Sequence, residues 1–325
     1  MFNWEKLGQL FDPAVHARGG WMHSYAQSPS AVVLSDRVRV FCCSRPPVGA
    51  DGMYVSYLAY IYLDRSDPRR VIGICEQPLL PLGERGTFDE FGTNPVSVIR
   101  DGAQLRAYYA GWTRCESVPV NGAIGVAVSD DDGRSFRRLG PGPVLSYAPD
   151  EPFMVGSPRI RRFNGHWVLW YVSGKVWLPA EGGRPEPVYK IRMAMSDDGF
   201  NWHRQGHDLI EDRLGANECQ ACADVLERDG RFHMFFSYRQ SHNYKGSQGG
   251  YRIGYAWSED MLNWVRQDER AGMSPSDDGW DSELANYPHV FELDGDHYML
   301  YQGNGMGRTG IGLARLHKGA DWSCP

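Results

Sequence analysis

The segment AIGVAVSDDDG at 123–133 is one of four copies of the same phrase. The other copies are KIRMAMSDDG at 190–199, RIGYAWSED at 252–260 and GIGLARL at 310–316. Each copy alternates in the manner of a β-strand, and three of them end in a tight turn of the Ser-Asp type. Their isoleucines, at 124, 191, 253 and 311, are about 60 residues apart, which indicates a repeated supersecondary unit.

A second pattern, typical of a β-hairpin, stands ahead of each copy. Apolar and polar residues alternate and are interrupted by an Asp-Gly or Asn-Gly turn. A less regular version at 28–45 is followed by strand-like segments at 57–64 and 71–75. The pattern thus occurs five times and predicts five units of four strands. The four regular hairpins are NPVSVIRDGAQLRAYYAGW (94–112), SPRIRRFNGHWVLWYVSG (157–174), CADVLERDGRFHMFFSYR (222–239) and YPHVFELDGDHYMLYQGN (287–304).

The N-terminus supplies the strand that the last unit lacks. FNWEKLGQLFD at 2–12 matches FNWHRQGHDLIED at 200–212, an outer-strand phrase, whereas no such phrase follows residue 316. Such an exchange closes a ring and removes an open sheet edge. We therefore predict an all-β, five-bladed β-propeller of four-stranded antiparallel blades, in one domain over 1–325. Its blades are expected at about 13–80, 81–145, 146–212, 213–272 and 273–316, the last completed by 1–12.

Composition narrows the possible partners. The net charge is -6 with both signs interspersed, so nucleic acid is not an expected partner. No apolar run reaches the ~20 residues of a membrane span, and the N-terminus does not resemble a secretory signal, which predicts a cytoplasmic protein without a membrane partner. The seven cysteines include a Cys219-x-x-Cys222 pair, but no second ligand pair accompanies it. We expect buried or site-lining thiols, and neither a metal nor another cofactor.

Loop lengths predict which face carries the site. With the strands of a blade named A to D from the centre outward, the A–B and C–D turns share one face and are short and alike. The B–C loops on the other face are long and dissimilar, which is typical of a face that builds a site. The predicted B–C loops are 45–53, 112–122, 174–188, 239–251 and 303–309.

Carboxylates stand ahead of the inner strands. Glu90, Glu218 and Glu283 each lie five residues before the residue on which the inner strands align, namely Pro95, Ala223 and Pro288. Crowded carboxylates in a concave site raise one another's pKa values, which yields an acid and a base. Solvated or ion-paired rim charges are the simpler alternative for any one of them. The third blade adds Glu151, and the first adds Trp21 and His23.

The chain resembles the five-bladed propeller glycosidases, which include glycoside hydrolase families 43, 32 and 68. Asn217-Glu218-Cys219 looks like the Glu-Cys motif of family 32, and this resemblance implies that Glu218 is the general acid. The segment at 280–314, which begins WDSE, resembles a glycosidase-like branch and makes Glu283 a second candidate. The aspartates of the superfamily are absent, because the matching positions hold Ser28, Asn94 and Ser157.

Further residues are candidates for substrate binding. Trp21, Trp177 and Tyr287 could stack on a sugar ring, although propeller packing explains them equally well. Asn94 is expected to bind substrate, and His23 could serve as an acid or base or hold a structural hydrogen bond. Arg159 and Arg239 could hold a carboxylate or phosphate, or pair with a glutamate of the site.

Three functions follow from these patterns. The first is a glycosidase-like enzyme in which Glu218 is the acid and Glu283 or Glu90 the base or nucleophile. The second is a lyase, cyclase or group transferase acting on a small polar substrate in a polysaccharide or secondary-metabolite pathway, because the usual aspartates are missing. The third is a propeller that binds carbohydrate without catalysis.

Overall fold

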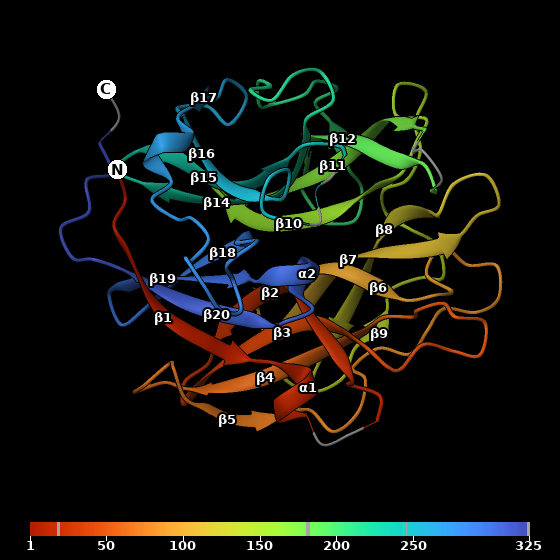
Figure 1. Ribbon diagram of the computed structural model, residues 1–325, viewed down its shortest axis with the longest axis horizontal. Coiled ribbons are helices and arrows are strands. Elements are labelled where there is room, and N and C mark those ends of the chain that lie inside the picture. Colours follow the sequence, from red (N-terminus) through yellow and green to blue (C-terminus); the bar gives the residue numbers. More distant parts are fainter. Residues whose placement is uncertain (18–19, 180–182, 243, 245, 324–325) are drawn as a thin grey trace.

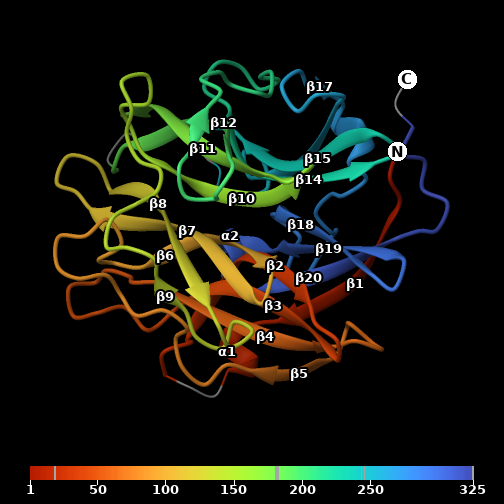
Figure 2. The same ribbon diagram turned by 180° about the vertical axis from the view of Figure 1, so that it is seen from behind.

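Five four-stranded antiparallel sheets surround a central axis in the computed structural model (Figure 1). The structure describes residues 1–17, 20–179, 183–242, 244 and 246–323. The inner strands of the five sheets contact one another around the axis, and the outer strands form the periphery, as the view from behind also shows (Figure 2). The predicted five-bladed β-propeller is confirmed.

The first three blades follow one another in chain order. Each is given from strand A to strand D. Blade 1 holds β2 (Ser24–Val33), β3 (Arg37–Arg45), β4 (Tyr57–Asp64) and β5 (Val71–Ile74). Blade 2 holds β6 (Thr93–Asp101), β7 (Gln104–Arg114), β8 (Val120–Ser129) and β9 (Arg137–Arg138). Blade 3 holds β10 (Val155–Phe163), β11 (His166–Leu178), β12 (Glu186–Ser196) and β13 (His203–Arg204).

The remaining two blades bring the chain back to its start. Blade 4 holds β14 (Cys219–Arg228), β15 (Arg231–Arg239), β16 (Arg252–Ser258) and β17 (Val265–Arg266). Blade 5 holds β18 (Asn286–Leu293), β19 (Asp296–Gln302), β20 (Ile311–Leu316) and, from the N-terminus, β1 (Trp4–Phe11). Three short helices lie in the connections: α1 (Pro13–His16), the 3₁₀-helix η1 (Asp268–Arg270) and α2 (Asn304–Gly307).

The repeated Ser-Asp phrase forms the C–D turn, because its aspartate carboxylate accepts hydrogen bonds from the backbone N–H groups of the turn. The Asp198 carboxylate accepts hydrogen bonds from the backbone N–H groups of Phe200 and Asn201, both at 2.8 Å. Asp260 does the same for Leu262 and Asn263. The N–H donated by Asn201 is the largest influence that holds the pKa of Asp198 below its usual range. The aspartate therefore stays charged and fixes the turn.

Strand β1 closes the ring as predicted. It pairs antiparallel with β20 from Trp4 opposite Leu316 to Phe11 opposite Ile311, and Figure 1 shows the red strand beside the blue one. Phe11 is fully buried in the largest apolar cluster, which it shares with residues of blades 1, 2 and 5. A Cβ atom at Gly310 would collide with the Phe11 carbonyl oxygen, so glycine permits this close approach.

Two predicted loops are shorter than expected. Strands β11 and β12 remain paired out to Leu178 and Glu186, so most of 174–188 is an extended hairpin. Strands β7 and β8 likewise reach Arg114 and Val120. Residues 180–182 of the loop predicted at 174–188, and residues 243 and 245 of the loop predicted at 239–251, lie outside the described residues. Periodicity alone could not reveal these ends, because they extend beyond the repeated hairpin pattern.

Closure by β1 makes a testable prediction about stability. Phe11→Ala should lower the free energy of unfolding by about 3–5 kcal/mol, because it removes a large side chain from a core shared by three blades. Val15→Ala, at a side chain that is 74% exposed, should change it by less than about 0.5 kcal/mol. Chemical denaturation should show one cooperative transition for both variants. A separate early transition of blade 5 in Phe11→Ala would contradict closure as a constraint on the whole ring.

Candidate functional site

A β-bulge opens every inner strand and turns one side chain toward the axis. Each A–B pairing shifts register at the residue before the aligned proline, or before Ala223 in blade 4. Four of these five residues have left-handed φ values, between 49° and 56°. Such values cost energy in residues other than glycine and are typical of functional sites. The five bulge residues are Ser28, Asn94, Ser157, Cys222 and Tyr287.

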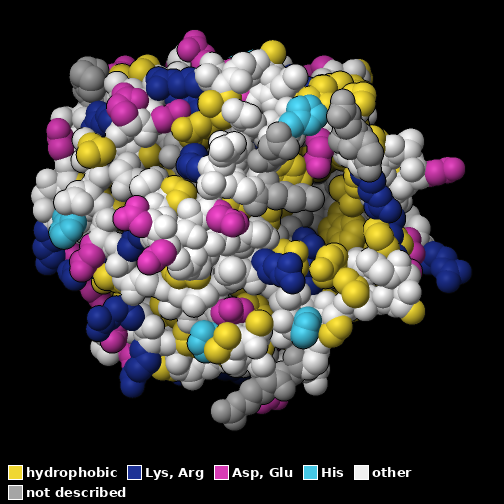
Figure 3. All heavy atoms as spheres, viewed as in Figure 1, with side chains coloured by type: hydrophobic (Ala, Val, Ile, Leu, Met, Phe, Trp, Pro, Cys, Tyr) yellow, Lys and Arg dark blue, Asp and Glu magenta, His cyan; other side chains and the backbone are white. Residues whose placement is uncertain are grey.

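A cavity of about 480 Å³ opens above this ring, on the face of the B–C loops. Figure 3 shows a hollow on this face with hydrophobic side chains along its wall. We call the cavity the central pocket. Its wall combines aromatic rings with amide and hydroxyl groups, a composition suited to a sugar ring. The side chains that the argument uses are Arg45, Tyr54, Asn94, Trp112, Asn121, Ser157, Tyr189 and Tyr287.

Arg45 is the one charged residue among the described residues of this wall. Its guanidinium lies 4.3 Å from the ring centroid of Tyr25 and 5.0 Å from that of Tyr54. Burial lowers its pKa, although arginine remains cationic at any physiological pH. No described carboxylate pairs with it, and its Nε atom is buried without a hydrogen-bond partner. The pocket therefore offers an uncompensated cation that two tyrosine rings hold in place.

Tyr189 and Tyr287 line the opposite side of the pocket, and Tyr251 contacts both of them. Tyr189 and Tyr251 share a hydrogen bond, and Tyr251 meets Tyr287 edge to face at 5.7 Å. Burial raises the pKa of all three tyrosines, so they remain neutral hydroxyl groups. Behind them, Arg239 donates to the Tyr189 hydroxyl at 3.0 Å and stacks on Tyr244. Arg239 thus orients Tyr189 and does not itself line the pocket.

The predicted carboxylates do not converge on this pocket. Glu218 is fully buried: it accepts from Arg266 Nη1 at 2.6 Å and from Gln220 Nε2 at 3.0 Å. Its second oxygen accepts the backbone N–H groups of Arg213 and Leu214. Glu151 is equally buried, between Arg204 at 2.9 Å and Arg192 at 3.0 Å. Neither has an oxygen turned toward the pocket wall, so both environments are those of structural ion pairs.

These pairs belong to a repeated interaction, which we call the blade clamp. In blades 2 to 5 a buried carboxylate ahead of strand A pairs with a cation on strand D. In blades 2, 3 and 5 a strand-B tyrosine also donates its hydroxyl to the carboxylate, and Gln220 replaces it in blade 4. The clamp pairs are Asp89–Arg138 (2.7 Å), Glu151–Arg204 (2.9 Å), Glu218–Arg266 (2.6 Å) and Asp281–Lys6 (2.7 Å).

The clamp corrects the predicted alignment of the glutamates. Asp89 and Asp281, not Glu90 and Glu283, are equivalent to Glu218. The Glu90 carboxylate accepts the Gly86 N–H at 2.9 Å within its own loop, and the Glu283 side chain is exposed. The prediction assumed that each carboxylate stands five residues before the aligned inner-strand residue. This spacing is not constant, because the segments between the clamp carboxylate and the bulge residue differ in length.

The other predicted residues divide into three groups. Asn94 and Tyr287 line the pocket, and the Asn94 Oδ1 atom is buried without a partner. Arg159 is fully buried in the channel, where it donates to the backbone carbonyls of Val96 and Pro288. Three residues do not reach the pocket wall. Exposed His23 only flanks β2, Trp177 is half-buried on β11, and Trp21 donates to the Glu76 carbonyl at the edge of blade 1.

The Cys219-x-x-Cys222 pair does not form a joint site in the structure. The Cys219 thiol donates to the Pro187 carbonyl at 3.2 Å, whereas the Cys222 sulfur accepts from the Ser157 hydroxyl at 3.3 Å. Burial raises the pKa of both thiols. The described residues contain no group of three or more His, Cys, Asp or Glu side chains placed to hold a metal ion. No helix in the described part of the chain is long and apolar enough to span a membrane.

Fold and pocket together define the class: a five-bladed β-propeller with its pocket on the axis. The structure aligns with a protein of the GH130 family of mannoside phosphorylases and glycoside hydrolases at a TM-score of 0.74 and 14% identity, over 100% of this chain and 97% of that one. It aligns with a thermostable family-43 glycoside hydrolase at a TM-score of 0.65 and 14% identity, over 95% and 97%. The predicted resemblance to propeller glycosidases is confirmed at the level of the fold.

The chain belongs to the same family as an uncharacterized protein of Mycobacterium tuberculosis, Rv1502. The two are 34% identical over 315 residues, which cover 96% of this chain and 99% of the relative. A β-1,2-mannobiose phosphorylase of Thermoanaerobacter is 26% identical over 154 residues, which cover 44% of this chain and 47% of that enzyme. No family model matches the chain.

The clamp predicts that Glu218 supports stability and not turnover. Glu218→Gln should lower the free energy of unfolding by roughly 3 kcal/mol, because the buried Arg266 charge loses one of its carboxylates. Glu259→Gln, at a pair whose glutamate is 71% exposed, should change it by less than about 1 kcal/mol. Thermal and chemical unfolding of both variants measure this difference. A Glu218→Gln protein with unchanged stability but abolished turnover would restore Glu218 as the general acid.

Proposed function

We propose that the protein is a glycoside-active enzyme that transfers a glycosyl group to an oxyanion held by Arg45, that is, a phosphorolytic enzyme. The observation that carries the proposal is the charge of the central pocket: one arginine without a carboxylate partner among the described residues, and no acidic side chain on the described wall. A guanidinium with free donors suits a phosphate group.

The surroundings of Arg45 support the proposal. A sugar can stack on Tyr54 or Trp112, while Asn94, Asn121 and Ser157 supply hydrogen-bonding groups for its hydroxyls. The relative from Thermoanaerobacter acts, by its name, as a phosphorylase of β-1,2-mannobiose, and a structural neighbour belongs to a family of mannoside phosphorylases. A mannoside is therefore the first substrate to test.

Phosphorolysis is chemically consistent with a pocket whose described residues include no carboxylic acid. The bond between the anomeric carbon and the glycosidic oxygen breaks, and a phosphate oxygen bonds to that carbon. The proton of hydrogen phosphate passes to the leaving oxygen, so a glycosyl phosphate and an alcohol form and the atoms balance. Arg45 would hold the phosphate and offset its charge as the new bond forms.

The two other functions fit the geometry less well. Hydrolysis by a carboxylate pair needs two carboxyl groups about 5–9.5 Å apart beside the bond, and the described wall offers none. A binding propeller would not require an uncompensated cation, since neutral hydroxyls and rings bind sugars. A catalytic role for any of the predicted acid–base residues would require the substrate to lie outside the central pocket, because none of them lines it. These residues are Glu218, Glu283, Glu90, Glu151 and His23.

The direct test is an assay of β-1,2-mannobiose cleavage with and without inorganic phosphate. We expect a mannosyl phosphate and mannose as products, formed only when phosphate is present. Arg45→Met should lower turnover about 100-fold, and Arg45→Lys less, because lysine keeps the charge but loses the planar fork.

Arg162→Met is the matched control. This arginine also stacks on an aromatic ring, 4.9 Å from Trp167, but it lies at the A–B turn of blade 3 on the other face. Its turnover should equal that of the wild type. Equal cleavage in phosphate-free buffer, or full activity of Arg45→Met, would overturn the proposal.

A further inference from the structure

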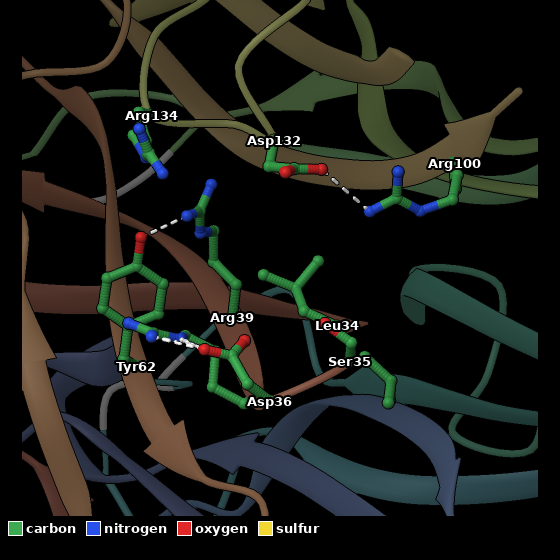
Figure 4. Close-up of a pocket in the computed structure, with 10 residues that line it drawn as sticks. Leu34, Ser35, Asp36, Arg39, Tyr62, Arg100, Asp132 and Arg134 are labelled. Carbon is green, nitrogen blue, oxygen red and sulfur yellow. Dashed lines mark hydrogen bonds and ion pairs between the residues drawn. The ribbon is translucent and has the colours of Figure 1, made fainter. Parts of the chain in front are cut away.

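A second cavity, of about 400 Å³, is drawn in Figure 4, and its lining residues place it on the face opposite the central pocket. It is formed between blades 1 and 2, by the A–B turn of blade 1 at 34–37, the end of β6 and the C–D turn of blade 2. We call it the arginine pocket, because four of its ten described lining residues are arginines. The lining residues are Val33, Leu34, Ser35, Asp36, Arg37, Arg39, Tyr62, Arg100, Asp132 and Arg134.

Arg39 is the unusual member of this set. Its side chain is 2% exposed, and no described carboxylate lies within ion-pairing distance. One nitrogen, Nη2, donates to the Tyr62 hydroxyl, whereas Nε and Nη1 are buried without a hydrogen-bond partner. Figure 4 shows the guanidinium turned into the cavity toward Asp132 and Arg134. A buried cation without a paired carboxylate is costly, and an anion in the cavity would offset its charge.

Aromatic rings hold Arg39 in this orientation. Its guanidinium carbon lies 4.6 Å from the ring centroid of Tyr60 and 4.7 Å from that of Tyr62. Arg37 covers the same Tyr62 ring at 4.9 Å. The fork is therefore fixed before any ligand arrives, which reduces the entropy lost on binding.

The charges of the pocket do not cancel. Arg37 donates to Asp36 at 2.8 Å, and Arg100 donates to Asp132 at 3.2 Å. Arg39 and Arg134 have no such partner among the described residues, so four arginines face two aspartates. Arg134 is exposed, and its backbone N–H is fixed by Asp131 at 2.9 Å. The excess of two positive charges matches a dianion.

We propose that the arginine pocket is a second binding site, specific for a phosphate dianion, either free inorganic phosphate or the phosphoryl group of a sugar phosphate. Arg39 and Arg134 would hold the phosphate oxygens from two blades. Arg37 and Arg100 would complete the positive surroundings. The site does not depend on the proposed phosphorolysis, because it lies on the other face and uses none of the residues of the central pocket.

Isothermal titration with inorganic phosphate tests the site in the Arg45→Met protein, in which the central pocket cannot contribute. We expect one phosphate bound per chain. Adding Arg134→Met should weaken binding at least tenfold, since a charge-assisted hydrogen bond is lost. Arg39→Met should also weaken binding at least tenfold. If loss of the buried Arg39 side chain impairs folding, the exposed Arg134 still allows the site to be tested through Arg134→Met. Arg162→Met should leave the affinity unchanged.

Two further experiments distinguish a specific phosphate site from nonspecific attraction of phosphate to a positively charged surface. Asp36→Asn and Asp132→Asn should each tighten binding several-fold, because they remove competing carboxylates while keeping the shape. Binding of glucose 6-phosphate should also strengthen between pH 5 and pH 7.5, because a phosphate monoester loses its second proton near pH 6. Tighter binding of glucose 6-phosphate than of inorganic phosphate would assign the natural ligand to sugar phosphates, and equal binding would assign it to free phosphate.

Several results would overturn this proposal. They are no binding in the Arg45→Met protein, an unchanged affinity in folded Arg134→Met and Arg39→Met variants, or no gain in Asp36→Asn and Asp132→Asn. Failure of the phosphate-dependent cleavage assay, with this binding intact, would overturn only the function proposed for the central pocket.

Discussion

The blade clamp is the interaction on which the rest of this structure depends. In four blades a buried carboxylate ahead of the inner strand is tied to a cation on the outermost strand. The segment that carries this carboxylate crosses its blade and delivers the chain to the bulge at the axis. Buried ion pairs add little net stability compared with apolar packing, but breaking one is costly, so they fix geometry. In blade 5 the cation is Lys6 of β1, and the same contact therefore also closes the ring.

The blade clamp and the bulge keep the buried carboxylates away from the central pocket. The acidic residues are used at mid-blade, where Arg and Tyr partners surround them, and the bulge residues at the axis are neutral. The bulge is nevertheless retained in all five blades, and four of the bulge residues have left-handed φ values. Such strain is maintained only where the surrounding structure imposes it, and it turns side chains into a shared space. The described residues of the pocket there are rings, amides and hydroxyls with one arginine, Arg45.

Arginine–tyrosine stacking recurs as a way to position a cation without a carboxylate. Arg45 on one face and Arg39 on the other occupy the same strand, β3, and each lies against two tyrosine rings. Side chains that are an even number of residues apart on a strand lie on the same side of the sheet. Arg39 and Arg45 therefore share one side of the sheet, but they lie near opposite ends of β3. One blade thus contributes to both pockets, and Tyr partners replace the acidic partners used in the clamps.

The sequence was sufficient for the fold but not for the site. Four copies of one strand phrase and the displaced outer strand at 2–12 define the ring, because local periodicity and turn chemistry repeat with it. The clamp carboxylates were misread because they stand at unequal distances from the aligned residue. Arg45 carried no local signal, since its importance arises from Tyr25 and Tyr54, which only the folded chain brings to it. Asn94 and Tyr287, which were predicted to bind substrate, line the central pocket, and their role there stays a prediction.

The central claim is that Arg45 binds the anion in a pocket whose described wall has no acidic group. A crystal structure of the protein soaked in tungstate, a tetrahedral oxyanion with strong anomalous scattering, tests it most directly. We predict an anomalous peak in the central pocket within hydrogen-bonding distance of the Arg45 guanidinium, and its loss in Arg45→Met crystals. A pocket without a peak, in crystals that bind tungstate elsewhere, would contradict this account.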